Sequence, residues 1–120
     1  MQEIEKQLTK SLAKAAQREY RSEYEEHHIT AKQAFRAAEA AGILNEILPG
    51  GVENPLNKVN LKTSVHRRIH NNVYYSLVNI LVIEAYNSAA GDRQKQYDNV
   101  ATVLGALRGF LESLNVLSIN

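Results

Sequence analysis

The sequence predicts a mainly α-helical domain with a small β element in its middle. Three observations lead to this prediction. Apolar residues recur at helical spacings towards both ends of the chain, a stretch containing both prolines and two adjacent glycines interrupts the middle, and one five-residue segment alternates apolar and polar residues. With 120 residues, 44% of them hydrophobic, the chain is long enough for one domain with a modest core.

Residues 2 to about 25 have the pattern of an amphipathic helix. Ile4, Leu8, Leu12 and Ala15 fall on one face, while charged and amide side chains occupy the others. We expect the apolar face of this N-terminal helix to lie on the core; binding of a partner by that face is the alternative.

A second helix is expected after Thr30, because Thr30 and Gln33 have the spacing of a capping box. The alanine-rich residues 31–41 continue the helix, and Gly42 is expected to close it. Residues 43–57 contain both prolines and two adjacent glycines, which predicts a long irregular connection.

The segment from Lys58 to Lys62 predicts a strand. Val59 and Leu61 are apolar and their neighbours are polar, as expected where one face of a strand is buried. This segment is the small β element of the predicted fold.

A long helix is expected over residues 65–90, capped by Thr63 or Ser64 and stopped by Gly91. Its apolar side is formed by residues four apart: Val65, Ile69, Val73, Leu77 and Leu81.

Asp92 is expected to cap the last helix, which pairs with the preceding one as a hairpin. Its core stripe follows spacings of three and four: Tyr97, Val100, Leu104, Leu107, Leu111 and Leu114.

The composition narrows the chemistry that the chain can perform. It has no cysteine, which excludes disulfides and thiolate metal sites, so a metal must be held by His, Asp, Glu, Asn or water. The net charge is +1, so a basic face for nucleic acid must come from local segregation of charge. No apolar run approaches the roughly 20 residues of a membrane span, and the first residues lack the order of a signal peptide.

All four histidines fall into two places, an adjacent pair at His27 and His28 and an i, i+4 pair at His66 and His70. Neutral imidazole is the commonest metal ligand, and its pKa near neutrality suits a general base. The i, i+4 pair shares one face of a helix, whereas neighbours in an extended segment point to opposite sides. The pattern predicts one hydrolytic site, in which three histidines hold an ion and the fourth activates water. Asn57, just before the strand, is expected to bridge a loop or to fix the tautomer of the base.

The order H-H-I, an Asn before a short strand, then V-H-x-x-I-H and a Tyr pair resembles the HNH/endonuclease VII superfamily. It is most similar to the bacterial toxin nucleases of the AHH group, over about Glu26 to Asn79. The resemblance implies a ββα-metal (His-Me finger) core over residues 26–79, embedded in a helical domain. Residues 1–25 would form an N-terminal helix and residues 80–120 a C-terminal helical hairpin, within a single nuclease domain.

By position in that motif, His28 matches the general base, and His27 and His70 match metal ligands. His66 matches a ligand or a phosphate contact, and Asn57 matches the Asn that orients the base. One departure is Glu26, which stands where the group has a small residue. An extra ligand or an orienting carboxylate is the alternative there to a solvent-exposed acid, which we favour.

Four basic residues near the motif are candidates for binding substrate. Arg67 and Arg68 follow His66, and guanidinium groups bind phosphate in a bidentate manner. Lys58 and Lys62 bracket the strand and can extend a basic strip along a nucleic-acid backbone.

The resemblance therefore implies a metal-dependent endonuclease, most consistent with a DNase toxin domain that uses Mg²⁺ or Zn²⁺, with Mn²⁺ or Ni²⁺ as further candidates. An RNase using the same histidines is one alternative, and a non-enzymatic helical module with a structural His–metal site is another. A toxin domain of this kind would be delivered from a bacterial producer to the target-cell cytoplasm as part of a larger secreted protein. It would require an acidic immunity protein in the producer, and no membrane partner is expected for this segment.

Overall fold

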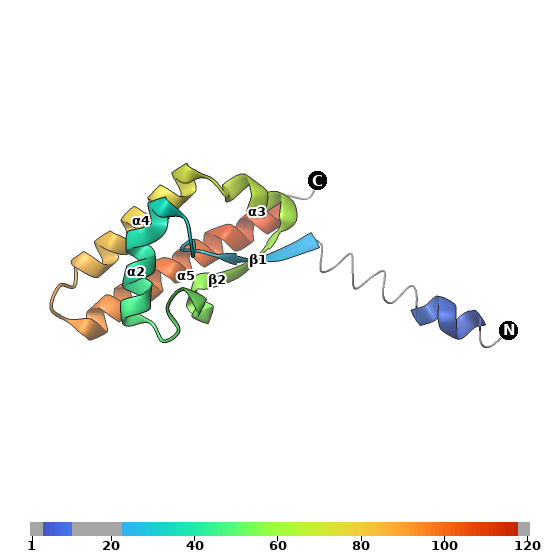
Figure 1. Cartoon of the computed structure of the whole chain (residues 1–120), viewed down its shortest axis with the longest axis horizontal. Helices are drawn as coiled ribbons and strands as arrows, with labels where there is room; N and C mark the ends of the chain where they lie inside the picture. Colours follow the sequence, from blue (N-terminus) through green and yellow to red (C-terminus); the bar gives the residue numbers. More distant parts are fainter. Residues whose placement is uncertain (1–3, 11–22, 118–120) are drawn as a thin grey trace.

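The computed structural model describes residues 4–10 and 23–117 (Figure 1). Residues 4–10 are helical. The elements that follow are β1 (Tyr24–His28), η1 (Phe35–Ala37), α2 (Ala38–Ile47), η2 (Gly51–Glu53), η3 (Pro55–Asn57), β2 (Lys58–Lys62), α3 (Thr63–Ile69), α4 (Asn72–Asn87) and α5 (Arg93–Leu117). The prediction of a mainly α-helical fold with a small β element is confirmed.

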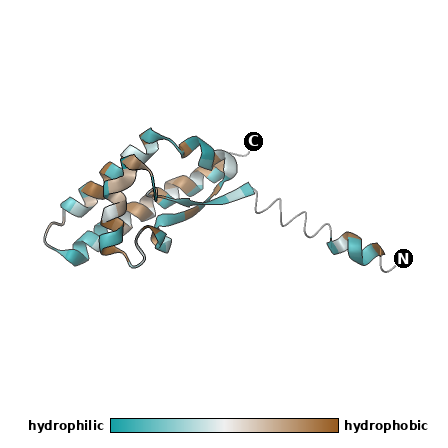
Figure 2. Cartoon of the chain, viewed as in Figure 1, coloured by the Kyte–Doolittle hydropathy of each residue, from teal (hydrophilic) through white to brown (hydrophobic). Residues whose placement is uncertain are grey.

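The core lies between a helical hairpin and the small sheet. α4 and α5 lie side by side, α2 crosses α4, and β2 lies against α5 (Figure 1). Apolar and polar residues alternate along these helices (Figure 2), and the buried ones include Leu44 of α2, Val82 of α4 and Leu104 of α5, while Val73, Leu77, Ile80 and Phe110 stay exposed. The fully buried side chains include Ile29, Leu44, Leu61, Val82 and Leu104, and burial of such residues is the main stabilising contribution to the fold.

The two strands form an antiparallel pair in which His28 is opposite Lys58 and His27 is opposite Val59. The predicted bounds of the second strand are confirmed. The predicted N-terminal helix is wrong at its end, because residues 24–25 belong to β1. Pairing with β2 satisfies the backbone groups of this segment, and that pairing outweighs its helical sequence pattern.

The apolar face expected on the N-terminal helix does not lie on the core over residues 4–10. Ile4 is 71% exposed and Leu8 is 59% exposed. The other two residues of that predicted face, Leu12 and Ala15, lie outside the described residues.

The second predicted helix is shifted along the chain. α2 begins at Ala38, because the segment after Thr30 is held by tertiary contacts instead: Thr30 is fully buried and its backbone N–H donates to Asn57. Gly42 does not end the helix, which continues to Ile47 and buries Leu44 and Ile47 on the same side as Ala40. The turn that follows uses glycines with positive φ at residues 50 and 51, as expected for this residue type.

The helix predicted over residues 65–90 is two helices separated at His70 and Asn71. The side chain of Asn71 accepts a hydrogen bond from the backbone N–H of Tyr74 and so caps α4. The break changes which side faces inwards: Val73 is 79% exposed, and Val78 is buried instead. The C-terminal hairpin accordingly begins at residue 72 and not at residue 80, and α4 ends before Gly91.

The last helix is confirmed. Asp92 accepts a hydrogen bond from the backbone N–H of Lys95, and Val100, Leu104 and Leu111 are fully buried. α5 also holds β2 in place, because the Asn115 amide accepts a hydrogen bond from the backbone N–H of Lys62 and donates one to the backbone carbonyl of Asn60. These bonds fix the strand that lies beside the histidines.

Among the described residues, α5 is the one helix long and apolar enough to cross a membrane, with a mean hydropathy of 1.3 over its most apolar 18 residues. Length and composition alone are weak evidence, because the core helix of a soluble protein passes the same test. In the structure α5 contacts α4 and β2 and buries Val100, Leu104 and Leu111, while 17% of its most apolar window is buried.

Candidate metal and catalytic site

The alternation of β1 separates the two adjacent histidines. His27 points inwards and is 1% exposed, while His28 is half-buried on the other side of the strand. Neighbours in a strand face opposite sides of the sheet, so one residue of the pair lies inside the domain and the next is reached from solvent.

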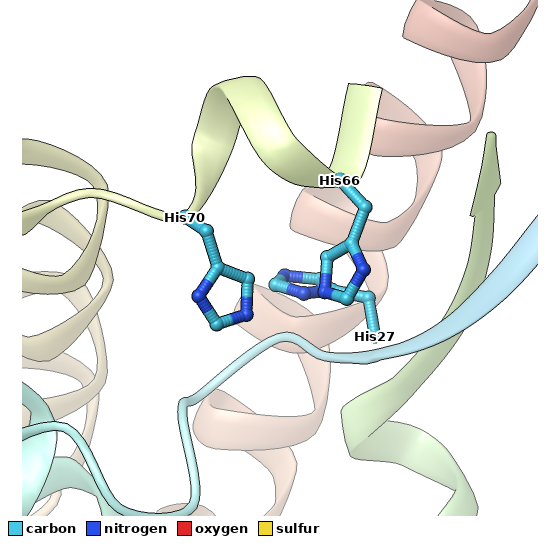
Figure 3. Close-up of side chains that lie close together, drawn as sticks. All are labelled: His27, His66 and His70. Carbon is cyan, nitrogen blue, oxygen red and sulfur yellow. The ribbon is translucent and has the colours of Figure 1, made fainter. Parts of the chain in front are cut away.

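Three imidazoles from β1 and α3 converge on one point (Figure 3). The ring centroids of His27 and His66 lie 4.9 Å apart, and those of His66 and His70 lie 4.7 Å apart. One ring nitrogen from each of these three histidines lies within 4.8 Å of the others, which is a separation that a single metal ion can bridge. His66 lies within α3 and His70 follows its last residue, so the i, i+4 spacing keeps both on one side despite the break in the helix.

The hydrogen bonds of His27 determine which of its nitrogens is available to a metal. The hydroxyl of Tyr74 donates to the backbone carbonyl of Ile29 at 2.8 Å, so it must accept from Nε2 of His27, which lies 2.9 Å away. Nε2 therefore carries the ring proton and Nδ1 carries a lone pair. Nδ1 is buried without a hydrogen-bond partner among the described residues. A buried lone pair of this kind is the chemistry expected of a metal ligand.

The other two imidazoles are held in a comparable way. Nδ1 of His66 lies 2.6 Å from a carboxylate oxygen of Glu25, and Nδ1 of His70 hydrogen-bonds the hydroxyl of Tyr75. In both rings Nε2 remains for the shared point. Partners on the outer nitrogen orient metal-binding histidines and raise their basicity, so the residues present fit a divalent metal.

The electrostatics of the cluster favour neutral rings at His27 and His70. Burial, with smaller contributions from the neighbouring histidines, lowers the pKa of His27 to about 3. Burial likewise lowers the pKa of His70, with His66 contributing in the same direction. A hydrogen bond from His66, with smaller contributions from Thr63 and from the charge of Arg67, holds the pKa of the Glu25 carboxyl below its usual range. Neutral rings beside an ionised carboxylate are the protonation states that bind a metal.

All four histidines line one cavity of about 680 Å³. Its wall is completed by residues from β1, from the loop before η1 and from the start of α4: Glu26, Ala31, Lys32, Gln33, Ala34, Phe35, Asn72 and Tyr75. The structure thus places His28 beside the three converging rings and open to the same space. The roles assigned to the four histidines stay predictions.

Asn57 lies behind this cavity and does not line it. The residue is fully buried; its amide donates to the backbone carbonyls of Thr30 and Val52 and accepts from the N–H of Thr30. The sequence predicts that Asn57 bridges a loop or fixes the tautomer of the base. These hydrogen bonds bridge a loop. A residue with no exposed surface does not touch a substrate, so the role predicted for Asn57 can only be exerted through the residues that it positions, and it stays a prediction.

The basic residues expected to bind substrate lie away from the cavity wall. Arg67 and Arg68 are exposed on α3, and Arg68 lines a separate small hollow with Leu114. The Lys58 ammonium pairs with Glu53 at 3.1 Å and with Glu26 at 3.6 Å.

Lys62 is half-buried at the far end of β2, where its backbone N–H donates to Asn115. The cation in the wall of the histidine cavity is Lys32.

Sequence reasoning missed Lys32 and also the partners of the histidines, which are Glu25, Glu53, Tyr74 and Tyr75. Glu25 holds His66, 41 residues away, and Tyr74 holds His27, 47 residues away, so spacing along the chain does not indicate these contacts. Glu53 lies 25 residues from His28 and its contact depends on the loop before η3, for which no spacing signal exists. Glu26 is the exposed acid that was favoured, with 56% of its side chain accessible.

Comparison with known proteins gives one finding. A family model described as a nuclease family of the HNH/ENDO VII superfamily with conserved AHH matches residues 8–110. No curated protein and no solved structure gives a significant match. The AHH motif of that description falls on residues 26–28, where this chain reads Glu-His-His.

Proposed function

This chain belongs to the AHH nuclease family of the HNH/ENDO VII superfamily, and from that premise we propose that it is a metal-dependent endonuclease that cleaves DNA, with His28 as the general base. The observation that supports this proposal most is the shared cavity of the four histidines, in which three rings present lone pairs to one point and the fourth lies beside them. A closed structural metal site usually has four ligands, and a fourth ring outside the cluster is what hydrolysis requires.

In the proposed reaction His28 takes a proton from the water that attacks phosphorus, at the open side of the cavity. His27, His66 and His70 are the residues that would hold a divalent ion. When bound, that ion supplies Lewis-acid stabilisation of the charge that develops on the phosphoryl group and on the leaving 3′ oxygen. Lys32 lies in the same wall and attracts the phosphate backbone.

Three imidazoles are a better ligand set for Zn²⁺ or Ni²⁺ than for Mg²⁺, which prefers oxygen ligands. Of the candidate metals we therefore favour Zn²⁺. Titration of the metal-free protein with Zn²⁺, Ni²⁺, Mn²⁺ and Mg²⁺ by calorimetry, followed by activity with each, would rank them. Activity restored by Mg²⁺ alone would contradict this order.

The test of the proposed function is a plasmid-nicking assay with and without EDTA, run beside a His28→Ala variant. We expect nicking by the wild type, its loss in EDTA, its return on adding the metal, and no nicking by the variant. Nicking that persists in EDTA would contradict a metal-dependent mechanism.

RNA is the second candidate substrate, because the net charge of +1 is low for a protein that grips duplex DNA. An RNA oligonucleotide and its 2′-deoxy counterpart distinguish the two. Cleavage of RNA alone, with no effect of EDTA, would indicate two histidines acting as acid and base and the 2′-hydroxyl acting as nucleophile.

We further propose that this nuclease is a bacterial toxin domain, delivered within a larger secreted protein to the cytoplasm of a target cell. A producer of such a toxin requires an immunity protein, and acidic residues on it would complement the exposed Arg67 and Arg68 of α3. Expression in a bacterial host with and without the adjacent reading frame tests both statements. Normal growth of cells that express the wild-type domain alone would contradict the toxin role.

A further inference from the structure

The ring of His28, which lines the cavity, has a carboxylate partner. Nε2 of His28 lies 3.1 Å from Oε1 of Glu53, the last residue of η2. Building on the proposed function, we propose that Glu53 is the positioning residue of the general base. It accepts the Nε2–H of His28, so that Nδ1 is the nitrogen that takes the proton from water.

The charge of Glu53 determines the direction of this hydrogen bond. The Lys58 ammonium lies 3.1 Å and the Lys32 ammonium 3.3 Å from the carboxylate oxygens. Hydrogen bonds from Lys58 and then Lys32, with a smaller one from His28, lower the pKa of Glu53 to about 2. An ionised carboxylate can only accept, so Nε2 of a neutral His28 must donate and its other nitrogen has no proton. A carboxylate holds a catalytic histidine in one tautomer in the same way in Ser-His-Asp triads.

The loop that carries Glu53 is fixed on both sides. A Cβ on Gly51 would lie 1.8 Å from Oδ1 of Asn45, which accepts a hydrogen bond from the backbone N–H of Val52. The Asn57 amide donates both to the carbonyl of Val52, beside Glu53, and to the carbonyl of Thr30, two residues after His28. Asn57 therefore sets the distance between the carboxylate and the base through the backbone on either side.

Glu53 can instead be regarded as a counter-ion of the two lysines and no more. The two interpretations predict different changes in kcat when Glu53 is removed. As a counter-ion only, Glu53 weakens the attraction of Lys32 and Lys58 for phosphate, so removing it would lower KM and leave kcat unchanged or higher. As a positioning residue it acts on the chemical step, so removing it lowers kcat whatever happens to KM.

The test compares Glu53→Ala with Glu46→Ala in the full chain. Glu46 is a matched control because it also pairs with a cation, Arg93 at 3.5 Å, and its side chain is 47% accessible against 45% for Glu53, while it does not line the histidine cavity. We expect kcat of Glu53→Ala to fall roughly tenfold to a hundredfold, with KM unchanged or lower and the metal affinity within about twofold of wild type. We expect kcat of Glu46→Ala to stay within about twofold of wild type. An unchanged kcat for Glu53→Ala, or an equal fall for both variants, would overturn the proposal.

A second measurement does not depend on activity. Long-range ¹H–¹⁵N correlation spectra of the metal-free protein, recorded well above the ordinary imidazole pKa, report which nitrogen of His28 carries the proton. We expect Nε2–H in the wild type and in Glu46→Ala, and a mixture of tautomers in Glu53→Ala. An Nδ1–H tautomer in the wild type would overturn the proposal even if the protein is a nuclease. The expected spectra would uphold the role of Glu53 even if the substrate class is wrong.

Discussion

His27 and His28 are neighbours in the chain, yet they lie in two different environments. His27 is 1% exposed, has its pKa lowered by burial and is held by Tyr74. His28 is half-buried at the cavity edge and is held by Glu53. The difference follows from the alternation of β1, which directs successive side chains to opposite faces.

The comparison extends to the two sides of the cavity. On one side, the buried His27 is joined by the half-buried His66 and the exposed His70, and the outer nitrogen of each ring has a hydrogen-bond partner. On the open side, Lys32 and Lys58 surround Glu53 with exposed ion pairs. One dipeptide thus supplies both a group suited to a metal and a group suited to proton transfer.

The largest expected effect comes from removing one histidine at a time from the two sides being compared. His28→Ala should lower the rate of hydrolysis about 10²- to 10⁴-fold, because a positioned general base is lost, and should leave metal affinity nearly intact. His70→Ala is the matched variant from the cluster of three histidines and should lose metal and activity together. Calorimetry and nicking assays on both variants check this, and the reverse pattern would exchange the two roles.

Removal of the buried Asn57 side chain should lower the stability of the fold. Asn57→Ala loses three buried hydrogen bonds and leaves backbone groups of Thr30 and Val52 unpaired. We expect the free energy of unfolding to fall by about 2–4 kcal/mol, measured by urea denaturation. Asn60→Ala, on an exposed position of the same strand region, should change it by no more than about 0.5 kcal/mol.

The Tyr74→Phe variant tests how the ring of His27 is held. Without the hydroxyl, Nε2 of His27 loses the acceptor that fixes its tautomer, and Nδ1 is no longer reserved for the metal. We expect metal affinity to fall about 10- to 100-fold, with the fold retained. Tyr97→Phe, a half-buried tyrosine of α5, is the control and should stay within about twofold of wild type.

A further expected effect concerns pH. His27 has a folded-state pKa of about 3, below the ordinary value of 6.5. The unfolded chain therefore takes up a proton before the folded protein does, and the free energy of unfolding of the metal-free protein should fall as pH decreases from 6.5 towards 3. The contribution is fully present above pH 6.5. Urea denaturation in EDTA across this range checks the sign, and a stability that rises on acidification would show that His27 is not buried as a neutral ring.

The parts of the fold that sequence predicts well are those fixed by local pattern. The stripe of α5 and the alternation of β2 both have one buried face, and both are found at the predicted positions. The parts that it predicts poorly depend on partners distant in the chain. Tyr24 and Glu25 form a strand only because β2 pairs with them, and the segment after Thr30 is not helical because Asn57 binds it.

The candidate site also has parts that the sequence predicts and parts that it does not. The two histidine pairs are visible in the sequence because strand and helix periodicities place them on definite faces. The groups that hold the rings are not visible in the same way, since Glu25, Glu53 and Tyr74 reach histidines 25 to 47 residues away. Asn57 is recognisable as an element of the motif, but only the fold shows that it bonds backbone and no substrate.

The unpaired Nδ1 of His27 has a consequence for the domain as a whole. In the proposed function this atom binds a metal ion, so the stability of the domain would then depend on how much metal the surroundings supply. A ligand present at about a thousand times its dissociation constant adds about 4 kcal/mol to the stability of a protein that binds it only when folded. With the proposed ion as that ligand, the same chain is easier to unfold where divalent ions are scarce and more resistant where they are abundant.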